Sequence, residues 1–329
     1  PFGIGACALG GEASFQYVKK VIELAMAGEI DATVTNALSK EAINMAGHHY
    51  SGHTEIYADY THTDKYTMML AHEELRVVHV STHVSLREAC DRVKKARVLE
   101  CIHIANEGCK ALGIENPKIG VAGLNPHCGE NGMFGTEEIQ EIQPAIDEAL
   151  AEGINIPEKK PTPPDTVFSK ALGGWYDIVV VMYHDQGHIP LKVKGFVYNK
   201  QEKHWEAVAG VNVTLGLPII RASVDHGTGF GHAGSGHANE LSLINAMDYA
   251  IQFANTKLKT GSSLPRILDR LQFPLPQAEI RWNQMIPADY FCFPRSFPVC
   301  CPIDPDCNRT ETWRAGWAGF QSLRRPRML

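Results

Sequence analysis

The prediction of the fold starts from two adjoining segments: Tyr176-Asp177-Ile178-Val179-Val180-Val181-Met182 and Tyr183-His184-Asp185-Gln186-Gly187-His188-Ile189-Pro190-Leu191-Lys192. The first segment is a short β-branched run, which is typical of a strand buried in a parallel sheet. The polar residues that follow therefore lie just beyond the end of a strand. Ligands of open α/β sheets bind outside the carboxyl ends of the strands, so this segment predicts a functional site. The alternative is a polar loop that only caps the strand.

The composition is that of an ordinary soluble protein. The chain has 329 residues, 44% hydrophobic and 21% charged, which can bury the core of one large or two smaller α/β domains. A net charge of -6 leaves no basic excess, so we expect neither nucleic acid nor an anionic membrane surface as the principal partner. No run approaches the roughly 20 apolar residues of a membrane span, and the first residues lack a signal-peptide pattern.

The nine cysteines fall into two groups. Five are scattered without metal or disulfide spacing, as expected for reduced thiols in a cytoplasmic protein. Four crowd the last part of the chain, where the absence of paired C-x-x-C units argues against a zinc site. From Thr260 onward, Pro, Arg, Trp and Cys occur without helical or strand period. We therefore expect an α/β domain over 1–259 and an irregular, disordered or foreign tail over 260–329.

Strand and helix patterns alternate before the tail. Strands are expected at 30–35, 76–83, 118–124 and 176–182, and strand with loop again over 210–228. Helices are expected at 13–28, 85–112, 136–153 and 239–257, with the one at 85–112 starting on a capping-box pattern. The polar segment 195–209 predicts a surface hairpin. This alternation indicates an α/β fold.

Histidines lie at three of the predicted strand ends: His83, His127 and His184. A single histidine is more often a satisfied core or surface residue, but three at equivalent places suggest a common role. Neutral imidazoles are the commonest zinc ligands, and three of them leave coordination positions open for water or substrate. Such an ion acts as a Lewis acid on a hydroxyl or carbonyl oxygen. His188 is expected to point the other way and to be structural.

Cationic and backbone donors suggest an anion site. Lys192 and Arg221 are candidates for phosphate or carboxylate binding, because lysine offers a point charge and arginine a planar fork. Gly52-His53-Thr54 at a helix start adds backbone N–H groups and a hydroxyl. Either cation alone could equally be a surface residue. The glycine-rich segment 226–239 permits close backbone approach to a ligand, although glycine enrichment more often means turns.

Taken together, the motifs resemble the 4-hydroxythreonine-4-phosphate dehydrogenase family. The resemblance covers roughly residues 11–257, and the polar excursion 195–209 looks more like the branch that acts on D-threonate or D-erythronate 4-phosphate. The motifs that carry it are Gly52-His53-Thr54-Glu55, Ser81-Thr82-His83, Gly123-Leu124-Asn125-Pro126-His127, Tyr183-His184-Asp185-Gln186-Gly187, Asn212-Val213-Thr214-Leu215-Gly216-Leu217-Pro218 and Ser223-Val224-Asp225-His226-Gly227-Thr228.

The resemblance implies an isocitrate/isopropylmalate-dehydrogenase-like fold, with two α/β subdomains around a cleft, working as a homodimer with a shared active site. The metal ligands it implies are His83, His127 and His184, shared between the two subunits, for zinc or else magnesium, cobalt or nickel. The substrate-binding residues it implies are His53, Thr54, Lys192, Asn212 and Arg221. Asp165 matches an active-site acid, so that Asp165 or Lys192 would move protons. The cofactor-binding positions it implies are Gly227, Thr228, Gly234 and Asn239.

The implied reaction is the NAD-dependent oxidation of a hydroxyl β to a carboxylate, followed by decarboxylation. The substrate would be a small phosphorylated four-carbon hydroxy acid: 4-phospho-D-threonate, 4-phospho-D-erythronate or 4-phosphohydroxy-L-threonine. The chain departs from the family in its first section, which lacks the usual Gly-Asp-Pro-Ala-Gly-Ile-Gly loop, so we expect that an N-terminal part is missing. In the nucleotide loop, Gly231 and Ser235 replace the usual acidic and basic residues.

These departures leave two other readings open. The chain could be a non-catalytic remnant that dimerises without binding nucleotide. It could also be a three-histidine metal hydrolase, which would form product without NAD.

Overall fold

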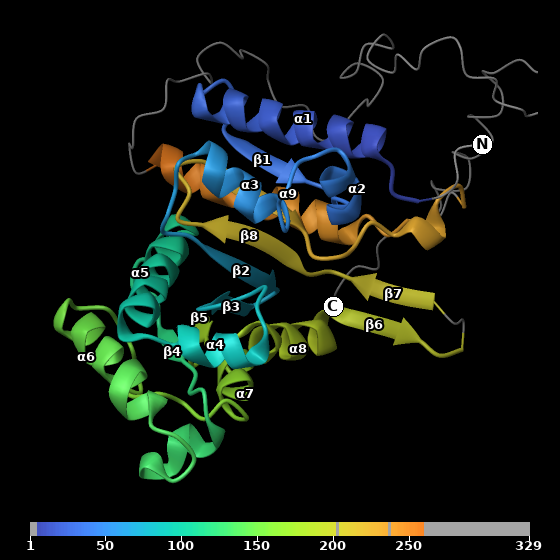
Figure 1. Ribbon diagram of the computed structural model, residues 1–329. Helices are drawn as coiled ribbons and strands as arrows, with labels where there is room; N and C mark the ends of the chain where they lie inside the picture. The colour runs from blue at the N-terminus through green and yellow to red at the C-terminus, as the bar shows by residue number, and fades with distance from the viewer. Residues whose placement is uncertain (1–4, 202–203, 236–237, 260–329) are drawn as a thin grey trace, which may run out of the picture. The chain divides into compact units, whose positions relative to one another are not determined.

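The computed structural model describes residues 5–201, 204–235 and 238–259, which include one seven-stranded mixed sheet (Figure 1). Its strand order is β1-β9-β8-β2-β3-β5-β4. The strands are β1 (Ala32–Thr35), β2 (Thr67–His72), β3 (Leu75–His79), β4 (Ile119–Val121), β5 (Ile178–Val181), β8 (Val211–Leu215) and β9 (Ile220–Val224). Strands β3, β5 and β4 run parallel to one another, and so do β1 and β9. The parallel strand predicted from the β-branched run is therefore β5.

Helices cover both faces of the sheet, because successive strand residues point to opposite sides. On one face Met69 and Val180 join a core with α5 (Lys95–Ala111), α6 (Gln143–Ala151) and α9 (Leu241–Lys259). On the other face Met68 and Val179 join a core with α7 (Val167–Leu172) and α8 (His184–Gly195). The predicted α/β class is confirmed.

A third cluster packs the first helices together at the β1 end of the sheet (Figure 1). It joins α1 (Ala8–Met26), α2 (Lys40–Met45) and α3 (His53–Tyr60) through Phe15, Ile43 and Ile56. Helices α1 and α2 cross so closely that a Cβ at Gly11 would lie 1.9 Å from the Ala42 carbonyl oxygen. Glycine is therefore required at that crossing.

Several predicted boundaries were wrong. The strand expected at 76–83 ends at His79, and the helix expected at 85–112 is two helices, α4 (Leu86–Arg92) and α5. They are separated at Val93, whose ψ of 88° is not helical. The helix expected from 136 begins with a π-helical turn, η2 (Glu138–Ile142), which continues into α6.

Other elements confirm or extend the prediction. The surface hairpin is present as β6 (Phe196–Asn199) and β7 (His204–Val208). Strand β2 was not predicted, because Thr67-Met-Met-Leu-Ala-His shows no polar alternation; the strand is buried on both faces. In the part of the chain that the structure describes, no helix is long and apolar enough to span a bilayer. The expected tail at 260–329 lies outside the described residues.

Candidate active site

One face of the β1-β9-β8-β2 half of the sheet is polar. The register aligns Thr33, Arg221, Thr214 and Met68 across the four strands in one row, and Thr35, Ser223, Asn212 and Leu70 in the next. Cross-strand partners point to the same side of a sheet, so these polar side chains share the face that α8 covers. The opposite face carries apolar residues such as Val213 and Ala222, which pack with α9. The sequence alternation around Asn212 and Arg221 therefore creates a polar surface within the fold.

Arg221 is the most unusual group on this face. Its side chain is only 2% exposed, and it donates to the Thr214 and Thr35 hydroxyls at 3.0 and 3.1 Å. The guanidinium lies 5.6 Å from the Tyr57 ring, and its Nε has no partner. Within the described residues no carboxylate forms an ion pair with it. Burial lowers the pKa of Arg221 to about 10. An unneutralised buried cation is costly, so this geometry favours an anionic ligand.

The first turn of α3 adds further groups to the same region. Burial, together with the charge of Arg221, lowers the pKa of His53 to about 3, so its imidazole is neutral. Thr54 and Glu55 line a cavity of about 550 Å³ that also contacts His79 and His83. The predicted substrate residues His53, Thr54 and Arg221 thus lie around the start of α3. The Oδ1 atom of Asn212, a row away from Arg221, is buried without a hydrogen-bond partner.

The opening stretch forms helix α8 rather than a polar loop, and it presents His184, His188 and Lys192 at successive helical turns. Gln186 holds the start of this helix against the sheet: its Oε1 accepts from the Met182 N–H at 2.7 Å, and its Nε2 donates to the Gly123 carbonyl at 2.8 Å. The amino group of Lys192 lies 3.8 Å from the Asp225 carboxylate at the end of β9. Burial raises the pKa of Asp225 to about 6.

Two of the three predicted metal ligands are neighbours. The ring centroids of His83 and His184 lie 5.9 Å apart. The His184 Nδ1 lies 2.6 Å from the Asp185 carboxylate, and the His83 Nδ1 lies 3.6 Å from the Glu55 carboxylate. A carboxylate at Nδ1 fixes the tautomer of a histidine and leaves Nε2 as the metal-binding atom. The chemistry of this pair suits a divalent cation, because neutral imidazoles are common metal ligands.

The third predicted ligand, His127, lies in a separate place after β4. Residues 127–131 all have positive φ, including the non-glycine His127 at 52° and Cys128 at 55°. Buried Glu138 holds this turn by accepting from the Leu124 and Asn125 N–H groups, both at 2.7 Å. Strained non-glycine backbone of this kind clusters at functional sites.

The structure does not bring His127 together with the other two histidines. In residues 5–201, 204–235 and 238–259, no group of three potential ligands is arranged to hold a metal ion. Asp165, the predicted active-site acid, belongs to the same separate region, since its charge acts on the nearby Cys128 thiol. The predicted site is therefore divided between two places within one chain.

The predicted cofactor positions lie in the exposed loop between β9 and α9. Gly229 and Gly234 have positive φ values of 62° and 77°, and residues 230–232 form a short 3₁₀ turn, η3 (Phe230–His232). The Asn239 Oδ1 accepts from the Leu241 N–H at 3.0 Å, so this side chain caps the start of α9. Gly227 and Thr228 are exposed in the same loop. This prediction remains untested by the geometry.

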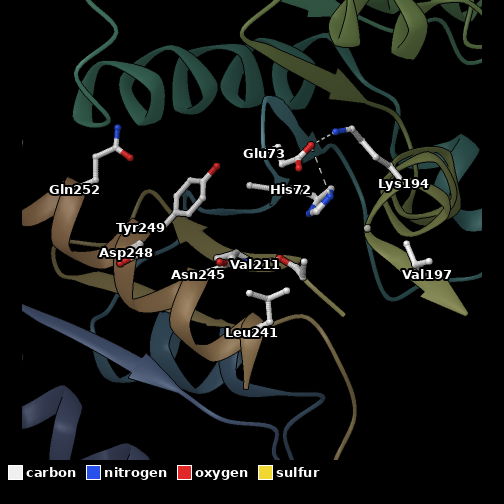
Figure 2. A pocket seen from close by; sticks show the side chains of 13 residues that line it. His72, Glu73, Lys194, Val197, Val211, Leu241, Asn245, Asp248, Tyr249 and Gln252 are labelled. Carbon is white, nitrogen blue, oxygen red and sulfur yellow. Dashed lines mark hydrogen bonds and ion pairs between the residues drawn. The ribbon is translucent and has the colours of Figure 1, made fainter. Parts of the chain in front are cut away.

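A separate cavity of about 630 Å³ lies between the β2–β3 turn, the end of α8 and α9 (Figure 2). Figure 2 shows Glu73 between His72 and Lys194, with Asp248 and Tyr249 on α9. None of the predicted site residues lines it.

The sequence reasoning assigned no role to Asp225 and Glu55, although both stand in the quoted motifs, and it dismissed His188. A helical reading of 184–192 would have placed His188 on the same face as His184. The five scattered cysteines, as expected, are free thiols: Cys7, Cys90, Cys101, Cys109 and Cys128.

A mixed sheet with helices on both faces and one polar face is an α/β architecture that many different enzymes share, so the fold alone does not fix the reaction. The family described as pyridoxal phosphate biosynthetic protein PdxA matches residues 5–250, and the chain belongs to this family. The resemblance noted in the sequence is thereby confirmed. Membership of a dehydrogenase family makes the protein an oxidoreductase and implies a pyridine-nucleotide cofactor.

Named relatives share almost half of the matched residues. D-threonate 4-phosphate dehydrogenase of Salmonella typhimurium is 47% identical over 247 residues, covering 75% of this chain and 72% of that protein. 4-Hydroxythreonine-4-phosphate dehydrogenase of Beijerinckia indica is 48% identical over 243 residues, covering 74% and 68%. The crystal structure of 4-hydroxythreonine-4-phosphate dehydrogenase from Klebsiella pneumoniae matches with a TM-score of 0.65 and 41% identity, covering 76% and 73%. These matches confirm the isocitrate/isopropylmalate-dehydrogenase-like fold.

Proposed function

We propose that the protein is an NAD- and divalent-metal-dependent dehydrogenase that oxidises and decarboxylates a phosphorylated four-carbon hydroxy acid. D-threonate 4-phosphate is the first substrate to test, because relatives of that name are among the most similar. 4-Phospho-D-erythronate and 4-phosphohydroxy-L-threonine are the next candidates. The observation that carries the proposal is Arg221, a buried guanidinium that pairs with no carboxylate among the described residues.

Arg221 and the start of α3 supply an anion site. A guanidinium already held by Thr35 and Thr214 is preorganised, so a phosphate or carboxylate would receive its remaining donor capacity without further ordering of the side chain. The neutral His53 and the Thr54 hydroxyl would complete that contact. Asn212 contributes a further buried polar group, because its Oδ1 lacks a partner.

The reaction requires a proton to leave the oxidised hydroxyl and another to reach the carbon left by decarboxylation. The hydride on the carbon that bears this hydroxyl goes to NAD, which becomes NADH, and the carboxylate on the adjacent carbon leaves as carbon dioxide. Lys192 and Asp225, 3.8 Å apart at the end of β9, form a pair that can hold and release protons beside the substrate face. Asp165 stays the alternative proton carrier.

The residues that would hold the cation are His83 and His184, with His127 as the third. A divalent ion such as zinc, magnesium, cobalt or nickel would supply Lewis acidity, which stabilises negative charge on a substrate oxygen. Because His127 and Asp165 lie apart from the other groups within one chain, we propose a homodimer in which each site takes these two residues from the partner subunit.

The test is NADH formation by the full chain with each of the three acids, with and without added metal. We expect turnover with D-threonate 4-phosphate that requires NAD and is abolished by a chelator. A folded dimer that turns over none of the three substrates would refute the proposal. Product formed without NAD would instead support a metal hydrolase.

A further inference from the structure

The ring of His188 lies against the ring of His184. The two centroids are 3.6 Å apart and the planes differ by 11°, so the imidazoles are stacked over one helical turn of α8. Positions i and i+4 are neighbours on a helix surface, which is how the sequence brings these rings together. The His184 ring also lies near His83, with the two ring centroids 5.9 Å apart. His184 is 36% exposed, so without the stack this side chain has room to rotate.

His188 itself is fixed in place. Its Nδ1 lies 2.9 Å from the His184 carbonyl oxygen, and because a carbonyl can only accept, Nδ1 is the donor. The His188 ring is 9% exposed and lies 4.9 Å from the buried His79 ring. Beneath it, α8 approaches the sheet so closely that a Cβ at Gly187 would lie 2.6 Å from His79 Nε2. His188 therefore has little freedom to move away from His184.

Burying an imidazole at this position has a free-energy cost, because the polar ring loses its contacts with water. A leucine would fill similar space without the cost of desolvating a polar ring. A flat ring, however, offers a planar contact that leucine cannot supply. The neighbouring Asp185 carboxylate already holds Nδ1 of His184, so the stack is the second restraint on the same ring.

We propose that His188 is a positioning residue for His184: its stacked ring fixes the plane of the His184 imidazole, so that the metal-binding Nε2 is held in one direction. This inference rests on the proposed metal dependence. It goes beyond it in naming a residue that contacts neither substrate nor cation. Supporting groups of this kind change metal affinity because they orient the ligand.

The experiment is Co²⁺ binding to the full chain, followed by absorption of the bound ion and by competition with a chelator. His188→Leu should weaken Co²⁺ binding about tenfold and alter the spectrum of the bound ion. His188→Phe retains a flat ring and should bind Co²⁺ within about twofold of the unsubstituted chain. His103→Leu is the matched control, since this exposed histidine of α5 pairs with Glu152 and should leave binding unchanged.

Thermal melting establishes that each variant is folded. If His188→Leu fails to fold, His188→Gln, which keeps a hydrogen-bond donor but no ring, takes its place. Equal Co²⁺ affinities for the ring-less variant and the unsubstituted chain overturn the inference while leaving the metal site standing. Co²⁺ binding that does not fall in His184→Ala overturns the proposed metal site, and with it the inference. Weak Co²⁺ binding by a folded His188→Phe also overturns the inference, because this variant keeps the flat ring that stacks on His184.

Discussion

The face around Arg221 and the turn around His127 differ in how much of a site each contains. The first gathers Arg221, His53, Asn212 and the Lys192–Asp225 pair on and beside one polar face of the sheet. The second offers a left-handed turn with exposed His127, and of the predicted site residues that the structure describes, Asp165 lies near it. The first region concentrates polar and charged groups, whereas the second presents a side chain outward. This division is compatible with the proposed site shared between two copies.

The largest effect should come from replacing Arg221. Arg221→Met removes the anion partner, and we expect kcat/KM to fall by about a thousandfold, since losing a buried charge contact costs about 4 kcal/mol. The free protein should melt no lower, because exchanging an unpaired buried charge for an apolar group is often neutral or stabilising. Steady-state kinetics and thermal melts check both parts. A large fall in melting temperature would mean that Arg221 is a structural residue.

Mixing two inactive variants tests whether Arg221 and His127 of one site come from different subunits. Arg221→Met and His127→Ala should each be almost inactive, by about a thousandfold. If each site takes Arg221 from one chain and His127 from the other, a refolded mixture contains heterodimers with one intact site. Random pairing then restores about a quarter of the native activity. Recovery of none, despite heterodimers seen by mass spectrometry, would place both residues in the same subunit's site.

A smaller effect concerns pH and the Lys192–Asp225 pair. Burial raises the pKa of Asp225 from 3.8 to about 6, so the neutral carboxyl is favoured in the folded chain. The stability that the folded chain gains from this raised pKa is fully present below the unfolded pKa of 3.8, and it is lost as the pH rises through the folded pKa of about 6. Asp225→Asn cannot ionise, so its stability relative to the native chain should increase by about 2 kcal/mol between pH 4 and pH 7.

Urea unfolding at several pH values measures this difference. The control is Asp185→Asn, an exposed carboxylate for which no such gain is expected. A constant difference between Asp225→Asn and the native chain across that range would show that Asp225 stays ionised, held by Lys192.

The sequence predicted the elements whose patterns are strong and local. Strand β5 followed from its β-branched run, and the polar alternation at Asn212 and Arg221 produced a polar face. Strand β2 escaped prediction because its Met-Met-Leu-Ala run is buried on both sides. Strand β2 pairs with β8, at least 140 residues later in the chain, and no local sequence pattern specifies this tertiary pairing.

The site residues show the same limit. His83 and His184 lie together because β3 and β5 are parallel neighbours, which their strand-end positions suggested. His127 follows the next strand, β4, by six residues and lies in a left-handed turn that the sequence pattern does not predict. His188 was misjudged because the segment was treated as the end of a strand. In a helix, four residues bring a side chain back to the same face.

The smallest effect tests what holds the turn around His127. Glu138 is buried, and its Oε1 accepts from the Leu124 and Asn125 N–H groups while its Oε2 accepts from the Asn125 side-chain amide at 2.9 Å. Glu138→Gln exchanges one acceptor oxygen for an NH₂ donor, which cannot receive these bonds. Hydrogen bonds to charged groups contribute about 1.5–3 kcal/mol, and partial replacement should lower the free energy of unfolding by about 1 kcal/mol.

Glu137→Gln is the matched control for this change. The neighbouring Glu137 accepts one bond from the Asn125 side chain, at 2.7 Å, and is less buried. We expect Glu138→Gln to increase proteolysis after residue 125. We also expect it to lower activity by a larger factor than the loss of folded protein explains, because the turn positions His127. Equal behaviour of the two variants would show that the left-handed turn holds its shape without Glu138. The outward-facing half of the site would then depend on its own backbone rather than on a buried carboxylate.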